Sequence, residues 1–195
     1  MTTITAPRVL TSGLRGSIRR DAAIVAVSTL VIAASAQIAV RLPFSPVPIT
    51  GQTLAVLLAG AALGPTLAIA STSLYLALAL AGLPVLAPAA DGTHLTGGAV
   101  LGSPTLGYVV GFLLASLAVG ALAERGLTRS VRGTVLAMVV GNGIIYALGL
   151  SWLHHTLGTS LVTTVTLGLT PFLVGDALKI AVAAGLLPSV WRLVR

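Results

Sequence analysis

The chain contains no cysteine, which excludes disulfide bonds, thiolate metal ligands and cysteine nucleophiles. Charge is scarce as well: charged residues make up 8% of the 195 positions, whereas soluble domains carry about 25%. The sequence has no P-loop motif, no His-Glu-x-x-His metal-binding motif and no Gly-x-Ser-x-Gly nucleophile motif. We therefore expect neither an enzyme nor a chain that hydrolyses ATP by the P-loop route, and we expect no metal or cofactor.

Apolar residues are abundant: 56% of the chain is hydrophobic and the mean hydropathy is +1.05. A chain of this length accommodates about six membrane spans of roughly 20 residues with short loops. The composition thus predicts an all-α polytopic integral membrane protein, a compact bundle of six transmembrane helices. The predicted spans are 21–40, 52–64, 66–83, 106–123, 133–154 and 165–187, of which the second is short for a full crossing. The long loop 83–107, between the third and fourth spans, is apolar enough to fold back over the bundle in an ordered form.

The arginines are distributed unevenly about these spans. Six spans place both termini, the 2–3 loop and the 4–5 loop on one side. Arg41 then lies alone on the other side. The remaining nine arginines lie on the side of the termini: Arg8, Arg15, Arg19, Arg20, Arg125, Arg129, Arg132, Arg192 and Arg195. The positive-inside rule therefore predicts a multi-pass cell-membrane protein with cytoplasmic termini: a basic N-terminal segment (1–20), a transmembrane domain (21–190) and a basic tail (191–195). The net charge of +7 reflects this clustering, so we expect a lipid bilayer and not a nucleic acid as partner.

One acid and one base interrupt the last span, in the segment "FLVGDALKIA" (172–181). Asp176 and Lys179, the only lysine, are three residues apart and so share one helix face. A charge near the bilayer centre costs at least ~2.5–3.5 kcal/mol, so such groups face one another or a cavity. Two interpretations follow: a self-neutralising pair that serves packing alone, or a polar ligand site that opens outward.

Four further polar residues lie in or beside the predicted spans. Gln52 begins the second span and Tyr108 the fourth, while Asn142 and Tyr146 lie within the fifth. Side chains of this kind often form hydrogen bonds between transmembrane helices, so each has a structural interpretation beside the functional one. The predicted depths of Gln52 and Tyr108 match that of Asp176, and Asn142 is expected nearer to Lys179.

Five motifs resemble, in order, those of the BioY family, the biotin-specific substrate-binding (S) components of energy-coupling factor (ECF) transporters. They are "LPFSPVPITGQTLAVLLAGAALGP" (42–65), "YLALALAGLPVLA" (75–87), "GYVVGF" (107–112), "GNGIIYALGLSWL" (141–153) and "PFLVGDALKIAVAAGLLP" (171–188). The resemblance covers residues 20–190. It implies six helices, capture of biotin from outside, and ATP-driven import by partners, namely a transmembrane T subunit and two cytoplasmic ATPases.

The resemblance also assigns residues. Asp176 and Lys179 match the family's Gly-Asp-x-x-Lys motif, which holds the polar head of biotin, and Asn142, Tyr108 and Gln52 match further family positions. The loop departs from the family's Gly-Pro-Thr-Gly-Gly-Tyr and reads "GSPTLGY" (102–108). On the first span, Ala22 and Ala26 form a small-x-x-x-small pair of the kind that the family uses to dock on the T subunit. Ordinary helix packing is the other interpretation of this pair.

Two ligand poses remain open at this stage. In one, Asp176 accepts from the ureido N–H groups and Lys179 donates to the ureido oxygen, with the valerate chain outward under the long loop. In the reverse pose Lys179 binds the carboxylate. Other functions also remain: a solitary secondary transporter or channel that uses the Asp–Lys pair for ion coupling, an S component for riboflavin or thiamine, or a small membrane-embedded enzyme.

Overall fold

A computed structural model describes residues 9–11, 16–89 and 91–194, and this part of the chain is mostly helical. Seven α-helices, two strands of two residues and three 3-10 helices follow one another in it. In chain order they are α1 (Ile18–Gln37), β1 (Ala39–Val40), β2 (Ile49–Thr50), α2 (Gln52–Leu63), α3 (Pro65–Leu80), η1 (Gly97–Gly102), α4 (Leu106–Glu124), η2 (Leu127–Arg129), α5 (Val131–Leu157), α6 (Leu161–Gly168), η3 (Thr170–Phe172) and α7 (Leu173–Val194). The all-α class is the one that the sequence predicts.

The helix ends follow local chemistry. Ser17 and Ser130 cap α1 and α5, because their side-chain oxygens accept hydrogen bonds from the backbone N–H groups of Arg20 and Gly133. Between α2 and α3 the chain reverses at Gly64, whose φ of 79° suits glycine, and Pro65 begins α3. Such signals are readable in the sequence, and the first five predicted spans agree with α1 to α5 to within a few residues.

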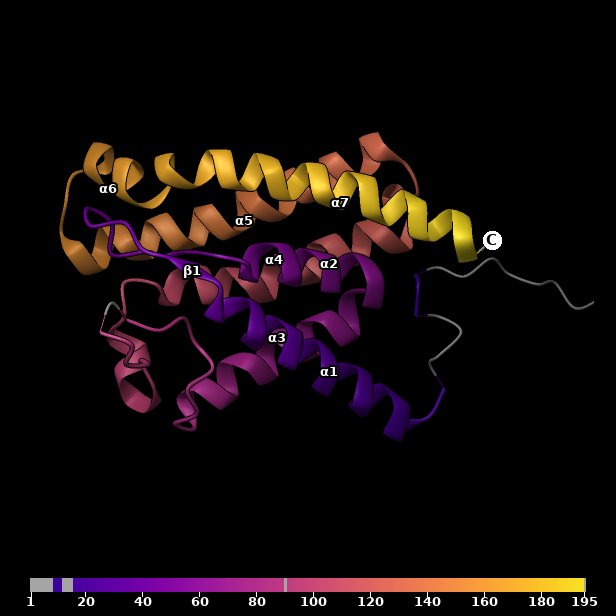
Figure 1. Cartoon of the computed structure of the whole chain (residues 1–195), viewed down its shortest axis with the longest axis horizontal. Helices are drawn as coiled ribbons and strands as arrows, with labels where there is room; N and C mark the ends of the chain where they lie inside the picture. Colours follow the sequence, from indigo (N-terminus) through magenta and orange to yellow (C-terminus); the bar gives the residue numbers. More distant parts are fainter. Residues whose placement is uncertain (1–8, 12–15, 90, 195) are drawn as a thin grey trace, which may run out of the picture.

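The fourth helix is the centre of the bundle. α4 packs against α2, α3 and α5, while α1 packs on α3 and α7 packs on α5 and α2, as Figure 1 shows. The approach to α3 is close, since a Cβ atom on Gly120 would lie 2.5 Å from the backbone nitrogen of Pro65. Ala115 and Val119 on the same helix are fully buried. Small residues on α4 therefore let its neighbours surround it.

The outer surface of the bundle is apolar. Large hydrophobic side chains point outward on α1 and α7, among them Leu30 at 65% exposure and Val174 at 82%. By length and composition, the segments Leu106–Glu124, Val131–Leu157 and Leu161–Leu193 could each cross a membrane. The apolar helices α2 and α3 are shorter, about 18 and 24 Å at 1.5 Å per residue. An apolar exterior of this extent is what a lipid environment requires.

The predicted sixth span is wrong in its bounds. It corresponds to two helices, α6 and α7, separated by η3, so the described chain has seven α-helices instead of six. Pro171 explains the break, because proline lacks a backbone N–H and disfavours helical geometry in the residue before it. At its other end α7 passes through Pro188 to Val194, beyond the predicted end at 187.

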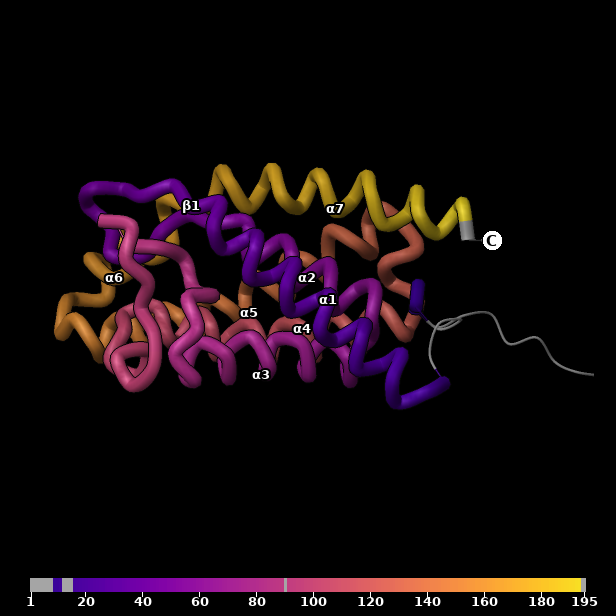
Figure 2. The backbone as a smooth tube through the Cα atoms, turned by 60° about the horizontal axis from the view of Figure 1, so that its bottom comes forward, coloured from indigo at the N-terminus to yellow at the C-terminus, as the bar shows by residue number. Residues whose placement is uncertain are grey.

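The two ends of the bundle differ in structure and charge. One end holds the start of α1, the α2–α3 turn, η2 and the end of α7, whereas the other holds the β1–β2 hairpin, the segment 81–105 and the α5–α6 connection, and Figures 1 and 2 agree on this. Six arginines lie near the first end: Arg19, Arg20, Arg125, Arg129, Arg132 and Arg192. Arg41 is at the hairpin end. Arg8, Arg15 and Arg195 lie outside the described residues.

Candidate functional site

A cavity of about 250 Å³ opens near the hairpin end of the bundle. The β1–β2 hairpin, the start of α2, the segment 81–105, α4, α5 and α7 all contribute to its wall. Its lining is mostly apolar, with Val47, Leu86, Val109, Phe112, Ile145 and Phe172, while its charged residues are Arg41, Asp176 and Lys179. An apolar wall with a few convergent polar groups is typical of small-molecule sites, and the volume is slightly below their usual range of ~300–1,000 Å³.

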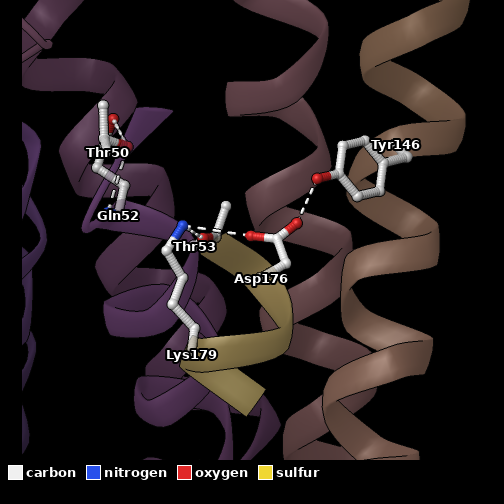
Figure 3. A network of polar contacts seen from close by, with 6 residues as sticks. All are labelled: Thr50, Gln52, Thr53, Tyr146, Asp176 and Lys179. Atoms are coloured by element: carbon white, nitrogen blue, oxygen red, sulfur yellow. Dashed lines mark hydrogen bonds and ion pairs between the residues drawn. The ribbon is translucent and has the colours of Figure 1, made fainter. Parts of the chain in front are cut away.

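Asp176 is the buried acid of this cavity, with 6% of its surface exposed. It lies in the first turn of α7, where the helix dipole favours a negative charge. Its Oδ1 atom is 3.2 Å from the Lys179 Nζ atom, and its Oδ2 atom accepts a hydrogen bond from the Tyr146 hydroxyl of α5 (Figure 3). The predicted pair therefore exists, and each carboxylate oxygen has one partner.

Lys179 joins α7 to α2. Besides its ion pair, its Nζ atom donates a hydrogen bond to the Thr53 Oγ1 atom at 2.8 Å, as Figure 3 shows. The Lys179 side chain is 18% exposed and lines the cavity. Thr53 was missed in the sequence, since a threonine near a helix start carries no distinctive signal. The lysine is thus held from two helices, with one of its three N–H donors left for a ligand.

Gln52 and Tyr75 connect the α2 wall of the cavity to α3. The Gln52 Oε1 atom accepts from the Thr50 hydroxyl at 3.2 Å, and its Nε2 atom donates to the Tyr75 hydroxyl at 2.6 Å. Tyr75 in turn donates to the backbone carbonyl of Val85 at 3.1 Å, so this series of hydrogen bonds connects α2, α3 and the start of the 81–105 segment. Gln52 lines the cavity as expected, but Tyr75, fully buried and central to this network, was not predicted.

Tyr108 lines the cavity with its ring. Its hydroxyl donates to the Gly168 carbonyl at 2.9 Å, and its ring meets that of Tyr146 edge to face with centroids 6.5 Å apart. The ring fits because two glycines leave room: a Cβ atom on Gly149 or Gly168 would lie 2.4 Å from a Tyr108 atom. Gly168 ends α6, so the split of the predicted sixth span positions Tyr108.

Asn142 is the predicted site residue that does not line the main cavity. It lines a separate small cavity of about 10 Å³ behind Lys179, together with Thr53, Met138 and Ile180. Asn142 is 8% exposed, and its Oδ1 atom has no hydrogen-bond partner among the described residues. The predicted depth, close to Lys179, agrees with this position. The structure brings the other five predicted residues, Gln52, Tyr108, Tyr146, Asp176 and Lys179, to one cavity.

The predicted docking pair lies away from the cavity. Ala22 and Ala26 are both exposed, one turn apart in the first half of α1, near the arginine-rich end. Their neighbours Ala23 and Val27 line an apolar groove between α1 and α2. The alanines are therefore accessible for contact with another helix.

Comparisons with known proteins agree with the sequence motifs. A family model described as the BioY family matches residues 7–195. A biotin transporter BioY of Rhizobium etli is 35% identical over 152 residues, which cover 74% of this chain and 78% of the relative. The biotin transporter BioY of Thermotoga maritima is 36% identical over 146 residues, 74% of this chain and 81% of the relative. A probable biotin transporter BioY of Pyrococcus horikoshii is 34% identical over 165 residues, which cover 84% of this chain and 91% of the relative.

One solved structure is also similar, the S-component for biotin from an ECF-type ABC transporter. The match has a TM-score of 0.77 at 26% sequence identity and covers 91% of this chain and 95% of that chain.

Proposed function

The chain belongs to the BioY family, and from this premise we propose that it is the biotin-binding S component of an ECF-type vitamin uptake transporter. The resemblance noted in the sequence is thereby confirmed. The family is one of membrane transporters, so the chain is a transport protein and not an enzyme. The chain captures biotin at an outward-facing site, and partner subunits use ATP for import.

The Asp176–Lys179 pair in an otherwise apolar cavity is the observation that carries this proposal. A carboxylate has about four lone-pair sites and Asp176 uses two, while the Lys179 ammonium has three donors and uses two. The pair therefore offers an acceptor beside a donor. A ureido group presents the complementary edge, with an N–H next to a carbonyl oxygen. We assign the ureido N–H to Asp176 and the ureido oxygen to Lys179.

The remaining site residues shape this pocket. Tyr146 holds the Asp176 carboxylate from α5, Tyr108 supplies an aromatic wall for the apolar ring system, and Gln52 keeps the α2 wall in place. Asn142 acts from behind, next to Lys179 and outside the ligand cavity. The apolar valerate chain then runs outward beneath the 81–105 segment.

The partners follow from the division of labour in such transporters. The chain has no P-loop motif, so import by it depends on a T subunit and two cytoplasmic ATPases. The exposed Ala22 and Ala26 let a helix of the T subunit approach closely. The arginine-rich end, with both termini, faces the cytoplasm of the cell, and the cavity faces outward.

Retention of radiolabelled biotin by the purified full-length protein tests the function. We expect tight binding that unlabelled biotin displaces and that riboflavin and thiamine do not. The Asp176→Asn variant is expected to remain folded and to lose affinity. A full-length preparation that does not retain biotin but binds another vitamin would overturn the assignment.

Uptake by vesicles tests the transport role. Ala22→Trp and Ala26→Trp are expected to abolish ATP-dependent uptake by the assembled complex while the isolated variants bind biotin normally. Loss of binding together with transport would instead mark the alanines as packing residues. Ion-driven uptake by the chain alone would favour the solitary secondary transporter, the competing function in which the Asp–Lys pair couples ions.

A further inference from the structure

Arg41 stands on the rim of the ligand cavity. It follows β1 directly, and the pairing of Val40 with Ile49 brings it beside the strand that leads to Thr50 and Gln52 in the cavity wall. Arg41 lines the cavity yet is exposed, so its guanidinium lies where the cavity meets solvent. The sequence predicted only that Arg41 lies on the side of the membrane opposite the other nine arginines.

The guanidinium of Arg41 is not committed to a partner. It has no hydrogen bond or ion pair within the part of the chain that the structure describes. Asp91 is an exposed residue whose pKa is lowered mainly by hydrogen bonds from Thr93. The positive charge of Arg41 lowers this pKa further, by a smaller amount. Lys179, by contrast, is neutralised by Asp176 and bound to Thr53.

The charge of the lining therefore has a direction. Two cations and one carboxylate line the cavity, and the cation that has no carboxylate beside it in the lining is Arg41 at the rim. A ligand with a neutral polar head and an anionic tail matches this distribution if the head enters first. The planar guanidinium suits a carboxylate because it can donate two parallel N–H bonds.

We propose that Arg41 is the specificity-determining residue for the ligand's carboxylate, binding it at the cavity mouth while the Asp176–Lys179 pair binds the neutral head. This inference rests on the proposed function and adds the orientation of the ligand. It assigns the preferred ligand class as amphiphilic monocarboxylates. The free acid therefore binds more tightly than its uncharged derivatives.

Affinities for biotin and for biotinamide, its uncharged analogue of nearly equal shape, test the proposal. Both are measured by displacement of radiolabelled biotin from purified wild type, Arg41→Gln, Arg41→Lys and Arg132→Gln. We expect wild type to favour the acid roughly five- to tenfold. An exposed ion pair between the guanidinium and the carboxylate is weak, and two parallel N–H donors on the guanidinium strengthen it. Arg41→Gln should bind both ligands equally, at the affinity of wild type for the amide, and Arg41→Lys should retain part of the preference.

Arg132→Gln removes an exposed arginine at the opposite end and should keep the full preference. An unchanged acid-to-amide ratio in Arg41→Gln overturns the proposal. So does a ratio that collapses only in Lys179→Met, which would place the carboxylate on the lysine in the reverse pose. Failure of wild type to bind either ligand would instead overturn the proposed function itself.

Discussion

Asp176 and Lys179 depend on each other because each is largely removed from water. Their side chains are 8% and 18% exposed, and loss of one partner leaves the other charge uncompensated. In dry sites this costs about 3–5 kcal/mol, and the cavity beside Lys179 reduces the cost here. Asn at 176 keeps the shape of the side chain but only one of the two acceptor oxygens that Tyr146 and Lys179 use, and it cannot neutralise the ammonium.

We expect the Asp176→Asn and Lys179→Met variants each to unfold at a lower temperature than wild type in detergent. The double variant should unfold at a higher temperature than either single one, since it buries no charge. Asp21→Asn, the same change in the first turn of α1 and away from the pair, serves as the control and should lower the unfolding temperature less than Asp176→Asn does. Additive losses in the double variant would show that the pair is not coupled.

At the residue scale, the sequence identified charged groups better than their partners. Asp176 and Lys179 stand out because charge is rare in an apolar span, and the family motif adds Gln52 and Tyr108. Thr53 and Tyr75 were missed, because a hydrogen bond between helices leaves no periodic or compositional trace in either segment. The sequence placed Arg41 only on the side opposite the other arginines, because its position at the cavity depends on the β1–β2 hairpin.

Among the elements, α5 supports the site through its small residues. Gly149 faces Tyr108 so closely that an added Cβ atom would lie 2.4 Å from the ring, whereas the space around Gly143 on the same helix is open to 4 Å. The two positions therefore differ in contacts while sharing a helix. Overpacking of a core costs about 1–3 kcal/mol, because neighbouring side chains must leave their preferred conformations.

The Gly149→Ala variant is accordingly predicted to lower the thermal unfolding midpoint and to weaken biotin binding, since Tyr108 must move and its ring lines the cavity. Gly143→Ala should leave binding unchanged and hold or slightly raise the midpoint, because alanine favours a helix over glycine. Calorimetry and thermal unfolding of the two variants in detergent provide the comparison. Equal effects at both positions would contradict the proposed role of Gly149.

Element boundaries were predictable where glycine and proline mark the end of one helix and the start of the next. Gly64 and Pro65 mark the α2–α3 turn, and the predicted second span 52–64 nearly coincides with Gln52–Leu63. The α6–α7 break was missed although Gly168 and Pro171 are a stop signal, because the apolar run continues through it. The strands β1 and β2 have two residues each, too few for an alternating pattern.

On the scale of the whole molecule, the distribution of charge predicts an orientation in the membrane. Residues at the two ends of α5 can be used to test it. Its 27 residues extend about 40 Å at 1.5 Å per residue, more than the ~30 Å hydrocarbon core of a bilayer. Val131 at its start is 57% exposed beside Arg129 and Arg132, and Thr156 near its end is exposed at the cavity end of the bundle. The two positions should therefore face opposite compartments.

Single cysteines can be introduced at these positions directly, because the chain contains no other cysteine. In intact cells, we expect a membrane-impermeant maleimide to label Thr156→Cys and not Val131→Cys, since the positive-inside rule retains the arginine-rich end in the cytoplasm. After the membrane is permeabilised, both variants should be labelled, which shows that Val131→Cys is reactive. The reverse pattern in intact cells would invert the orientation and place the cavity mouth and Arg41 on the cytoplasmic side. Biotin could then not enter the cavity from outside, so this labelling also tests the direction of capture.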